Sequence, residues 1–353
     1  MSKTKIQGTT AGRRPNSVPV SVISGFLGSG KTTLLNRLVQ HPDMSDAALI
    51  VNEFGDVGID HALVNSALEN TVVMDSGCLC CTMRGDFLDT VSELFDNVRD
   101  GRIPAFSKIL IEPTGLADPG PIIHAIDQLE MTDHPCHRDA IITMVDGQQG
   151  NQPIDEHIEI SRQIAVADIV MITKVDIADA AAVESLRHRI HTVNPGIPIR
   201  NVVQGNIDVA DLFGLAAQSA LTVANPTGFQ KSEGHTHDHE GHDHGNVVHG
   251  TIQTHSITTE ERINWDRLRY FLETIFSLRG AAFLRVKGIV WLENASEAIV
   301  VQAVGTALSP PETLGRDDDD SGTTRLVFIY EGLRGDAIEQ TFRALVLNGK
   351  TSS

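Results

Sequence analysis

Short apolar runs alternate with segments of helical spacing through the first two-thirds of the chain. We expect buried strands at residues 18–23, 47–51, 71–74, 108–111, 140–146 and 169–172. Between them, residues 33–39, 83–98 and 154–165 carry apolar side chains at helical spacing, so each predicts a helix with one core-facing side. This alternation continues to about residue 212 and predicts an α/β fold, a doubly wound and mainly parallel sheet.

The hydrophobic pattern stops between residues 225 and 250 and resumes in a different form. Six of the chain's 15 histidines fall in this window, among acids and glycines. Such a segment cannot bury a core, so we predict a flexible linker that collects metal weakly; a purely solvating linker is the alternative. Strands at 251–257, 282–292, 298–304 and 326–330 with helices at 265–278 and 336–347 then predict a smaller α+β domain, which we expect to dock on the first.

These patterns divide the chain into four parts. We predict a disordered lead at residues 1–16, a first domain at 17–224, the His-rich linker at 225–250 and a second domain at 251–347.

The composition of the chain limits the kinds of partner that the protein could bind. The formal net charge of −18 argues against nucleic acid, whose phosphates need a basic face. No apolar run approaches the roughly 20 residues that cross a bilayer, and no signal peptide is evident, so we expect a cytoplasmic protein with no membrane partner. Of four cysteines, three lie in one tetrapeptide, which is typical of thiols available to a metal rather than of a disulfide framework.

A glycine-rich loop joins the first strand to the first helix and reads G-F-L-G-S-G-K-T over residues 25–32. Glycines allow backbone N–H groups to converge on an anion at a helix N-terminus, which predicts nucleoside triphosphate binding. Lys31 would reach the β- and γ-phosphates, and the Thr32 hydroxyl would ligate Mg²⁺. The predicted nucleotide-binding residues of this loop are Gly25, Gly28, Ser29, Gly30, Lys31, Thr32 and Thr33.

Two further loops carry acids after predicted strands. Glu53 and Asp56 follow the second strand and are candidate switch residues that sense Mg²⁺ and the γ-phosphate, although a solvated acidic turn has the same composition. Glu112 ends the strand at 108–111, and Gly115 follows three residues later, an arrangement similar to Walker B. It places Glu112 near Mg²⁺ and the attacking water, and the Gly115 N–H near the γ-phosphate.

The segment Cys78-Leu79-Cys80-Cys81 presents three thiols within four residues. Three thiolates can bind one soft cation such as Zn²⁺, and the absence of a second C-x-x-C leaves an open position of the kind that a metal carrier needs. Small buried side chains and a redox pair are the alternatives. Cys136 stands alone between two histidines and is interpreted as incidental.

A second nucleotide signal lies at the end of the strand at 169–172. Lys174 and Asp176 have the spacing by which GTPases read guanine, because a carboxylate can accept hydrogen bonds from guanine N1–H and its 2-amino group. Thr173 stands where that motif usually has Asn.

Together, G-F-L-G-S-G-K-T-T at 25–33, N-E-F-G-D at 52–56, C-L-C-C at 78–81 and E-P-T-G-L-A-D-P at 112–119 closely resemble the CobW-type family of metallochaperone GTPases. The resemblance extends from about Val18 to the C-terminus. It implies a G domain of the signal-recognition and nitrogenase type, GTP hydrolysis, and delivery of a transition metal, most often zinc, to a client metalloprotein.

Carried over by position, the resemblance assigns Lys31 and Glu112 to the hydrolytic centre and Lys174 and Asp176 to guanine. It implies that Cys78, Cys80 and Cys81 bind the metal, with Glu53 as a further candidate ligand.

We therefore expect GTP, Mg²⁺ and Zn²⁺ as ligands, and a homo-oligomer controlled by nucleotide or metal. In this interpretation GTP orders the acidic and cysteine loops, and hydrolysis releases them. Two alternatives stay open: an insertase for cobalt or another metal that serves corrinoid or nitrile-hydratase-type clients, and a non-catalytic metal buffer.

Overall fold

The computed structural model describes residues 17–51, 72–75, 85–129, 136–207, 209, 212, 252–314 and 322–347. Four predicted features lie outside these residues: the N-terminal lead, the acidic loop with Glu53 and Asp56, the cysteine loop and the His-rich linker.

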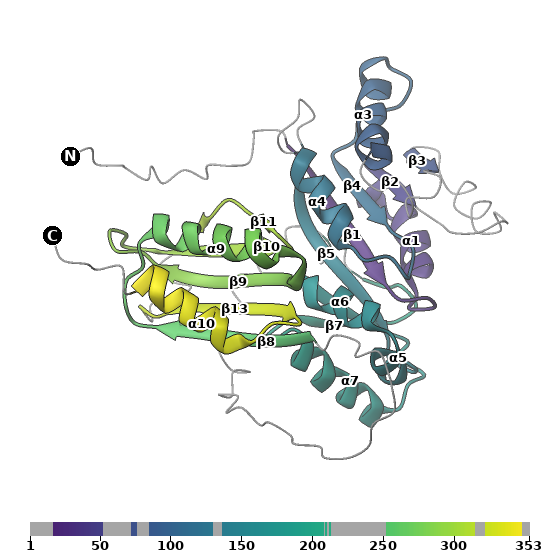
Figure 1. Cartoon of the computed structure of the whole chain (residues 1–353). Coiled ribbons are helices and arrows are strands. Elements are labelled where there is room, and N and C mark those ends of the chain that lie inside the picture. The colour runs from purple at the N-terminus through teal and green to yellow at the C-terminus, as the bar shows by residue number, and fades with distance from the viewer. Residues whose placement is uncertain are drawn as a thin grey trace.

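The first part of the chain forms a seven-stranded sheet whose strand order is β3-β2-β4-β1-β5-β6-β7. Every pairing in it is parallel. Figure 1 shows these strands and their helices at the right of the molecule. The strands are β1 (Val18–Gly25), β2 (Ala47–Val51), β3 (Val72–Asp75), β4 (Lys108–Glu112), β5 (Cys136–Asp146), β6 (Ile169–Thr173) and β7 (Ile199–Val202).

Helices pack on both faces of this sheet. Leu34, Leu35 and Leu38 of α1 share a core with one face, and Phe87 of α3 and Ile122 of α4 share a core with the other. The doubly wound fold predicted from the alternating pattern is therefore confirmed. The helices are α1 (Lys31–Val39), α3 (Gly85–Arg99), α4 (Gly120–Leu129), α5 (Asn151–Glu156), α6 (Ile158–Val166) and α7 (Ala180–Val193), with a short 3₁₀ turn η1 (Pro42–Met44).

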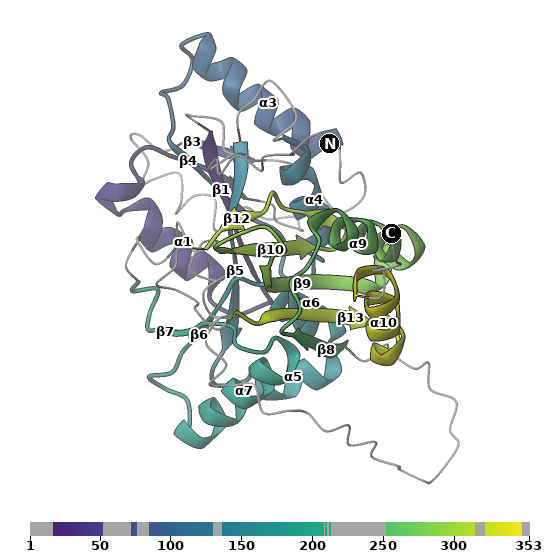
Figure 2. The ribbon, with the colours of Figure 1, turned by 90° about the vertical axis from the view of Figure 1, so that its left-hand side faces the viewer.

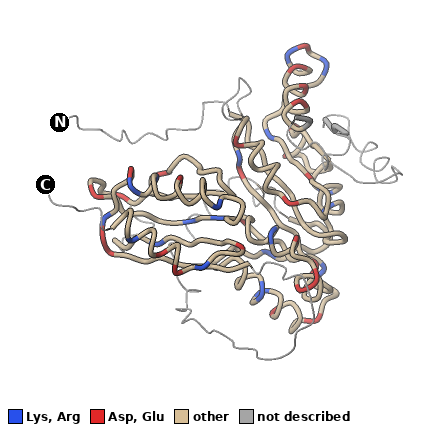
Figure 3. Tube along the Cα trace, viewed as in Figure 1, with Lys and Arg blue, Asp and Glu red and all other residues tan. Residues whose placement is uncertain are grey.

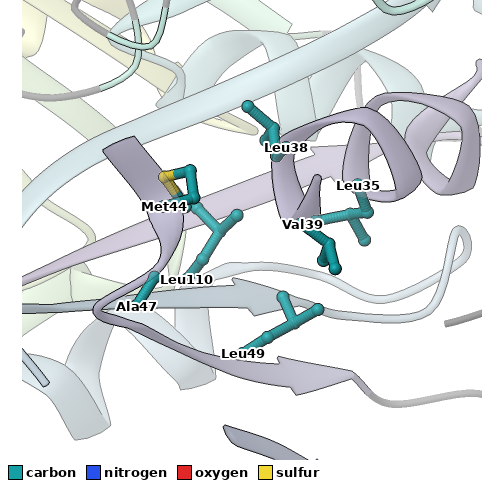
Figure 4. Close-up of a pocket in the computed structure, with 7 residues that line it drawn as sticks. All are labelled: Leu35, Leu38, Val39, Met44, Ala47, Leu49 and Leu110. Atoms are coloured by element: carbon teal, nitrogen blue, oxygen red, sulfur yellow. The ribbon is translucent and has the colours of Figure 1, made fainter. Parts of the chain in front are cut away.

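A small hollow lies behind α1, between this helix and strands β2 and β4. Figure 4 shows that its lining side chains are all apolar. They are Leu35, Leu38, Val39, Met44, Ala47, Leu49 and Leu110. Because these side chains offer no hydrogen-bond donor or charge, the hollow belongs to the packing that anchors α1 and not to a phosphate site.

The second part of the chain folds into an antiparallel sheet of order β11-β10-β9-β13-β8, with β12 paired to β10. Helices α9 and α10 cover one of its faces (Figure 1). In the core between them, the ring of Phe271 meets the rings of Phe328 and Phe342 edge to face. Figure 2 shows the same sheet lying across the first domain. Its elements are β8 (Ile252–Thr259), α9 (Trp265–Arg279), η3 (Gly280–Ala282), β9 (Phe283–Trp291), β10 (Ala298–Val304), β11 (Ala307–Leu308), β12 (Glu312–Thr313), β13 (Thr324–Glu331), α10 (Gly335–Phe342) and η4 (Arg343–Leu347).

Three elements differ from those that the sequence predicts. In the second domain, the helix expected at 336–347 is α-helical only to Phe342, and η4 continues it as a π-helical turn. The helix expected at 154–165 is broken at His157, whose extended backbone (φ −128°, ψ 105°) separates α5 from α6. The strand expected from residue 140 begins four residues earlier, at Cys136, which is buried in the core. The sequence does not indicate this extension because His137 and Arg138 are polar. Their backbone nevertheless pairs with Pro19 and Val20 of β1.

Candidate functional site

The carboxyl ends of the parallel strands form one edge of the first sheet, where ligands bind in folds of this type. The predicted loops after β1, β4 and β6 all begin at this edge, because β1 pairs with β4 and β5, and β5 pairs with β6. The structure therefore brings the glycine-rich loop, Glu112 and the Thr173–Asp176 segment to the same edge of the sheet.

The glycine-rich loop has a backbone that only glycine adopts readily. Gly25, Gly28 and Gly30 have positive φ angles of 145°, 75° and 95°. A Cβ atom at Gly25 would lie 2.5 Å from the carbonyl oxygen of Met144, so a side chain there cannot be accommodated. Helix α1 starts directly afterwards at Lys31, with Thr32 and Thr33 exposed in its first turn. This geometry suits a phosphate at the helix N-terminus, with a hydroxyl free for a cation.

Lys31 is buried, 6% exposed, and lies folded across its own loop. Its Nζ donates to the carbonyl oxygens of Gly25 at 2.8 Å and Phe26 at 3.2 Å. Burial lowers the pKa of Lys31, and the negative charge of Glu112 partly offsets this effect. The Ser29 hydroxyl is also buried and has no hydrogen-bond partner among the described residues. The Lys31 ammonium and the unpaired Ser29 hydroxyl could both donate hydrogen bonds to a phosphate in this loop.

Glu112 and Gly115 lie against the glycine-rich loop. Glu112 ends β4 and is buried. A Cβ at Gly115 would lie 2.8 Å from the amide nitrogen of Leu27, so glycine permits the two loops to touch. On its other side, the Gln163 amide donates to the carbonyl oxygens of Gly115 and Ala117, each at 3.1 Å. The loop predicted to approach the γ-phosphate is thus positioned from both sides.

The Thr173–Asp176 segment is connected to the glycine-rich loop by a hydrogen bond. The Thr173 hydroxyl donates to the carbonyl oxygen of Ser29 at 2.8 Å. Lys174, whose φ of 54° is unusual for a residue with a side chain, donates to Asp146 Oδ2 at 2.6 Å. Asp176 is exposed and has its carboxylate available to a ligand. Thr173 therefore ties the two nucleotide segments together at the position where Asn is usual.

Sequence reasoning missed two residues of this site. Asp146 ends β5, accepts from Lys174 and also accepts from the backbone amides of Gln148 and Gln149. Its place at the end of a predicted strand was a usable signal. Gln163 lies within a helical pattern, and nothing in the sequence separates it from a surface glutamine.

The predicted metal ligands Cys78, Cys80, Cys81 and Glu53 lie outside the described residues. The strand that precedes the cysteine loop is described, and Asp75 at its end pairs in register with Val51 of β2. Val51 in turn pairs with Glu112. Within the described ranges, no group of three His, Cys, Asp or Glu side chains could hold a metal ion. Cys136 is buried, and burial raises the pKa of its thiol to about 12, so this thiol is not poised to bind metal.

The fold and the loops at its carboxyl edge define a P-loop nucleotide-binding domain followed by a smaller antiparallel domain. Residues 19–201 match the CobW/HypB/UreG nucleotide-binding domain, and residues 252–346 match the C-terminal domain of the cobalamin synthesis protein cobW. The chain belongs to the CobW family of P-loop GTPases.

Several of its relatives are named zinc chaperones. The chain is 32% identical over 362 residues to the zinc chaperone CobW of Pseudomonas aeruginosa, covering 92% of this chain and 91% of the relative. It is 27% identical over 330 residues to the zinc chaperone YjiA of Escherichia coli, covering 94% and 99%. The crystal structure of Zn(II)-bound YjiA GTPase from E. coli superposes with a TM-score of 0.68 at 25% identity, again covering 94% and 99%. Both domains therefore have counterparts in these proteins.

Two properties of the described residues bear on partners. None of the described helices has the length and apolar character needed to cross a membrane. Figure 3 shows that the lysines and arginines of the described chain are interspersed with acidic residues along the elements.

Proposed function

We propose that this protein is a GTP-hydrolysing metallochaperone that binds Zn²⁺ at Cys78, Cys80 and Cys81 and transfers it to a client metalloprotein. The observation that carries the proposal is the register of three neighbouring strands. Asp75, Val51 and Glu112 lie level with one another across β3, β2 and β4. Neighbouring strands are about 4.8 Å apart, so the cysteine loop starts roughly 10 Å from the strand end that carries Glu112.

In this proposal the glycine-rich loop binds the phosphates of GTP. Lys31 exchanges its two carbonyl partners for phosphate oxygens, which are stronger acceptors for a cation. The exposed Thr32 hydroxyl and the buried Glu112 carboxylate fit a Mg²⁺ site, since both supply the oxygen ligands that this ion prefers. Bound Mg²⁺ would neutralise charge on the β- and γ-phosphates.

The guanine base is assigned to Lys174 and Asp176. Asp146 holds Lys174 in place, while the Asp176 carboxylate remains exposed to accept hydrogen bonds from the base. Replacing Asp176 by Asn should weaken GTP binding and admit xanthosine triphosphate, whose 2-oxo group needs a donor. Competition binding of GTP against ATP measures the selectivity directly, and equal affinity for both would contradict the assignment to guanine.

We assign Zn²⁺ binding to the cysteine loop because three thiolates are suitable ligands for zinc. The relatives from E. coli and P. aeruginosa are also named zinc chaperones. The acidic loop after β2 and the cysteine loop after β3 start from adjacent strands, so a nucleotide that orders one can change how the thiolates of the other converge. We propose that GTP favours metal retention and that hydrolysis favours transfer, in the cytoplasm and with a nucleotide- or metal-dependent homo-oligomer as one form of the protein.

The experiment that tests this function is steady-state GTP hydrolysis with and without stoichiometric Zn²⁺. The wild type should hydrolyse GTP at a rate that Zn²⁺ changes. The Cys78→Ser, Cys80→Ser, Cys81→Ser triple variant should bind GTP normally and show no response to Zn²⁺. Glu112→Gln should bind GTP but hydrolyse it much more slowly. A wild type that binds Zn²⁺ tightly without hydrolysing GTP would instead indicate a metal buffer.

A further inference from the structure

Helix α6 lies between the nucleotide edge and the C-terminal domain. In Figure 1 it stands beside the ends of β9 and β13, with the parallel sheet on its other side. At its start, the His157 ring lies 4.7 Å from the ring of Phe26 in the glycine-rich loop. Helix α6 and the residue that precedes it therefore contact both the glycine-rich loop and the second domain.

In the middle of α6, Gln163 is fully buried with its amide directed at the Gly115 loop. Both of its contacts are carbonyl oxygens, so the amide nitrogen must face the loop. The Oε1 atom of Gln163 is buried and has no partner in the described part of the chain. An unpaired buried acceptor destabilises a fold, and a leucine at this place would avoid that cost. What the glutamine provides is a pair of donors that fix the Gly115–Ala117 backbone.

Other residues of α6 contact the C-terminal domain. Arg162 donates from Nε and Nη2 to Glu331 Oε2 at the end of β13, at 3.1 and 2.9 Å. Arg285 of β9 donates to the carbonyl oxygen of Val166 and to the carboxylate of Asp168, directly after the helix. Ala165 packs against Val327 and Ile329 of β13 in the C-terminal sheet. The position and tilt of α6 are thus set by contacts from both domains.

We propose that Gln163 is a positioning residue for GTP hydrolysis and that the C-terminal domain holds it in place through α6. Gln163 fixes the Gly115 loop against the glycine-rich loop, and Arg162 and Arg285 fix the helix that carries Gln163. This inference rests on the proposed GTPase function. It gives the second domain a role in the rate of hydrolysis.

Gln163→Leu tests the positioning role, with Thr143→Val as its matched control. The Thr143 hydroxyl donates to the backbone carbonyl of Gln163 at 2.9 Å, so its loss perturbs the same buried turn and spares the amide. Gln163→Leu should lower kcat at least tenfold while the Kd for GDP, measured with a fluorescent analogue, changes less than threefold. Thr143→Val should leave both constants within twofold of the wild type. An unchanged kcat in Gln163→Leu would overturn the proposal.

A double-mutant cycle on Arg162 and Glu331 tests the role of the C-terminal domain. Arg343 and Glu339 on α10 form the matched control, since Arg343 also donates from Nε and Nη2 to one carboxylate oxygen, at 3.0 and 2.7 Å. Arg162→Ala and Glu331→Gln should each lower kcat two- to fivefold, with no further loss when combined, whereas Arg343→Ala should not change kcat. Additive losses, or an equal loss in Arg343→Ala, would overturn the coupling.

A readout without turnover separates failure of this inference from failure of the proposed function. Amide hydrogen exchange of residues 114–118 in the GDP-bound protein should be at least threefold faster in Gln163→Leu and in Glu331→Gln than in the wild type. Exchange that is unchanged in both variants would contradict the inference even if GTP is hydrolysed. Faster exchange in a protein that never hydrolyses GTP would support the positioning and contradict the GTPase function.

Discussion

Two lysines in this molecule are almost equally buried and sit in very different surroundings. Lys31 in the glycine-rich loop is 6% exposed, and Lys287 on β9, at the contact between the domains, is 5% exposed. Lys31 donates to two carbonyl oxygens and lies near Glu112. Around Lys287, burial and the charge of Arg285 lower the pKa to about 7, and Asp168 only partly opposes them.

The difference shows that burial of a charged group does not by itself identify a functional site. Lys31 is held by backbone oxygens that a phosphate can replace, at a sheet edge where ligands enter. Lys287 lies beside an ion pair that fixes one domain on the other, in a place where protonation costs free energy. The partners of each lysine, rather than its exposure, distinguish a ligand-binding cation from an interface cation.

The largest expected effect on ligand binding comes from replacing Lys31, one of the two compared lysines. Lys31→Met should weaken GTP binding about 100-fold or more, because charge-assisted bonds to phosphate are lost. Lys287→Met is the matched control, a lysine of equal burial whose loss should leave the Kd for GTP within twofold. Titration with a fluorescent GTP analogue measures both. Equal weakening in the two variants would show that the interface lysine also belongs to the nucleotide site.

The next effect concerns the ion pair beside Lys287. Burial alone would raise the pKa of Asp168, but Arg285, Lys287, Arg138 and the Ile141 amide outweigh it, so the pKa lies below its ordinary value. Arg285→Leu would leave this buried carboxylate without its main partner and should lower the free energy of unfolding by about 3 kcal/mol or more. Urea unfolding followed by tryptophan fluorescence is suitable, since both tryptophans of the chain, Trp265 and Trp291, lie in the C-terminal domain.

The exposed pair of Arg343 with Glu339 provides the contrast for that measurement. Arg343→Ala should change the free energy of unfolding by less than about 1 kcal/mol. A similar loss in both variants would mean that the buried pair contributes no more than a surface pair.

A smaller effect is the pH dependence of folding stability that is caused by Lys287. Its pKa is about 7 in the folded protein and 10.5 ordinarily, so between these values the unfolded chain binds a proton that the folded protein lacks. Stability from this group therefore rises with pH through that window, by about 1.4 kcal/mol per unit at most, and is constant below it.

Lys287→Met should flatten the stability profile between pH 7 and 9. The comparison stops at pH 9 because of the Cys136 thiol. Its pKa is raised from 9.0 to about 12, so it makes stability fall as pH rises above 9. Urea midpoints at half-unit steps check the slope. A slope that is identical in wild type and variant would contradict the assignment of a near-neutral pKa to Lys287.

The smallest effect concerns Thr173. Thr173→Val removes the hydroxyl that donates to Ser29 and keeps the side-chain shape. One neutral hydrogen bond contributes about 1 kcal/mol, so GTP should bind about fivefold more weakly. Calorimetric titration measures this loss, and Thr143→Val, which removes a buried hydroxyl elsewhere on the sheet, should show none.

Much of the first domain could be predicted because its signals are local. Buried parallel strands are continuous apolar runs, and the glycines at 25, 28 and 30 mark a backbone that other residues rarely adopt. The break at His157 could not be predicted, since its ring meets Phe26, a contact that closes only in the folded chain.

The part of the site that escaped prediction depends on contacts between distant segments. Gln163 contacts Gly115 and Ala117, which precede it in the chain by 48 and 46 positions. Helical periodicity therefore carries no information about these contacts. The same holds for Arg285 and Asp168, separated by 117 positions, whose pairing requires both domains to be in place. The roles of Cys78, Cys80 and Cys81 stay a prediction from their spacing.

We propose that nucleotide state and metal affinity are coupled through the neighbouring ends of β3, β2 and β4. Coupling between two ligands is reciprocal, and a tenfold effect corresponds to about 1.4 kcal/mol. The most direct measurement is Zn²⁺ affinity by chelator competition, in the GDP-bound protein and with a non-hydrolysable GTP analogue. We predict at least tenfold tighter Zn²⁺ binding with the GTP analogue, lost when the three cysteines are replaced by serine. Equal affinities in the two nucleotide states would contradict the account.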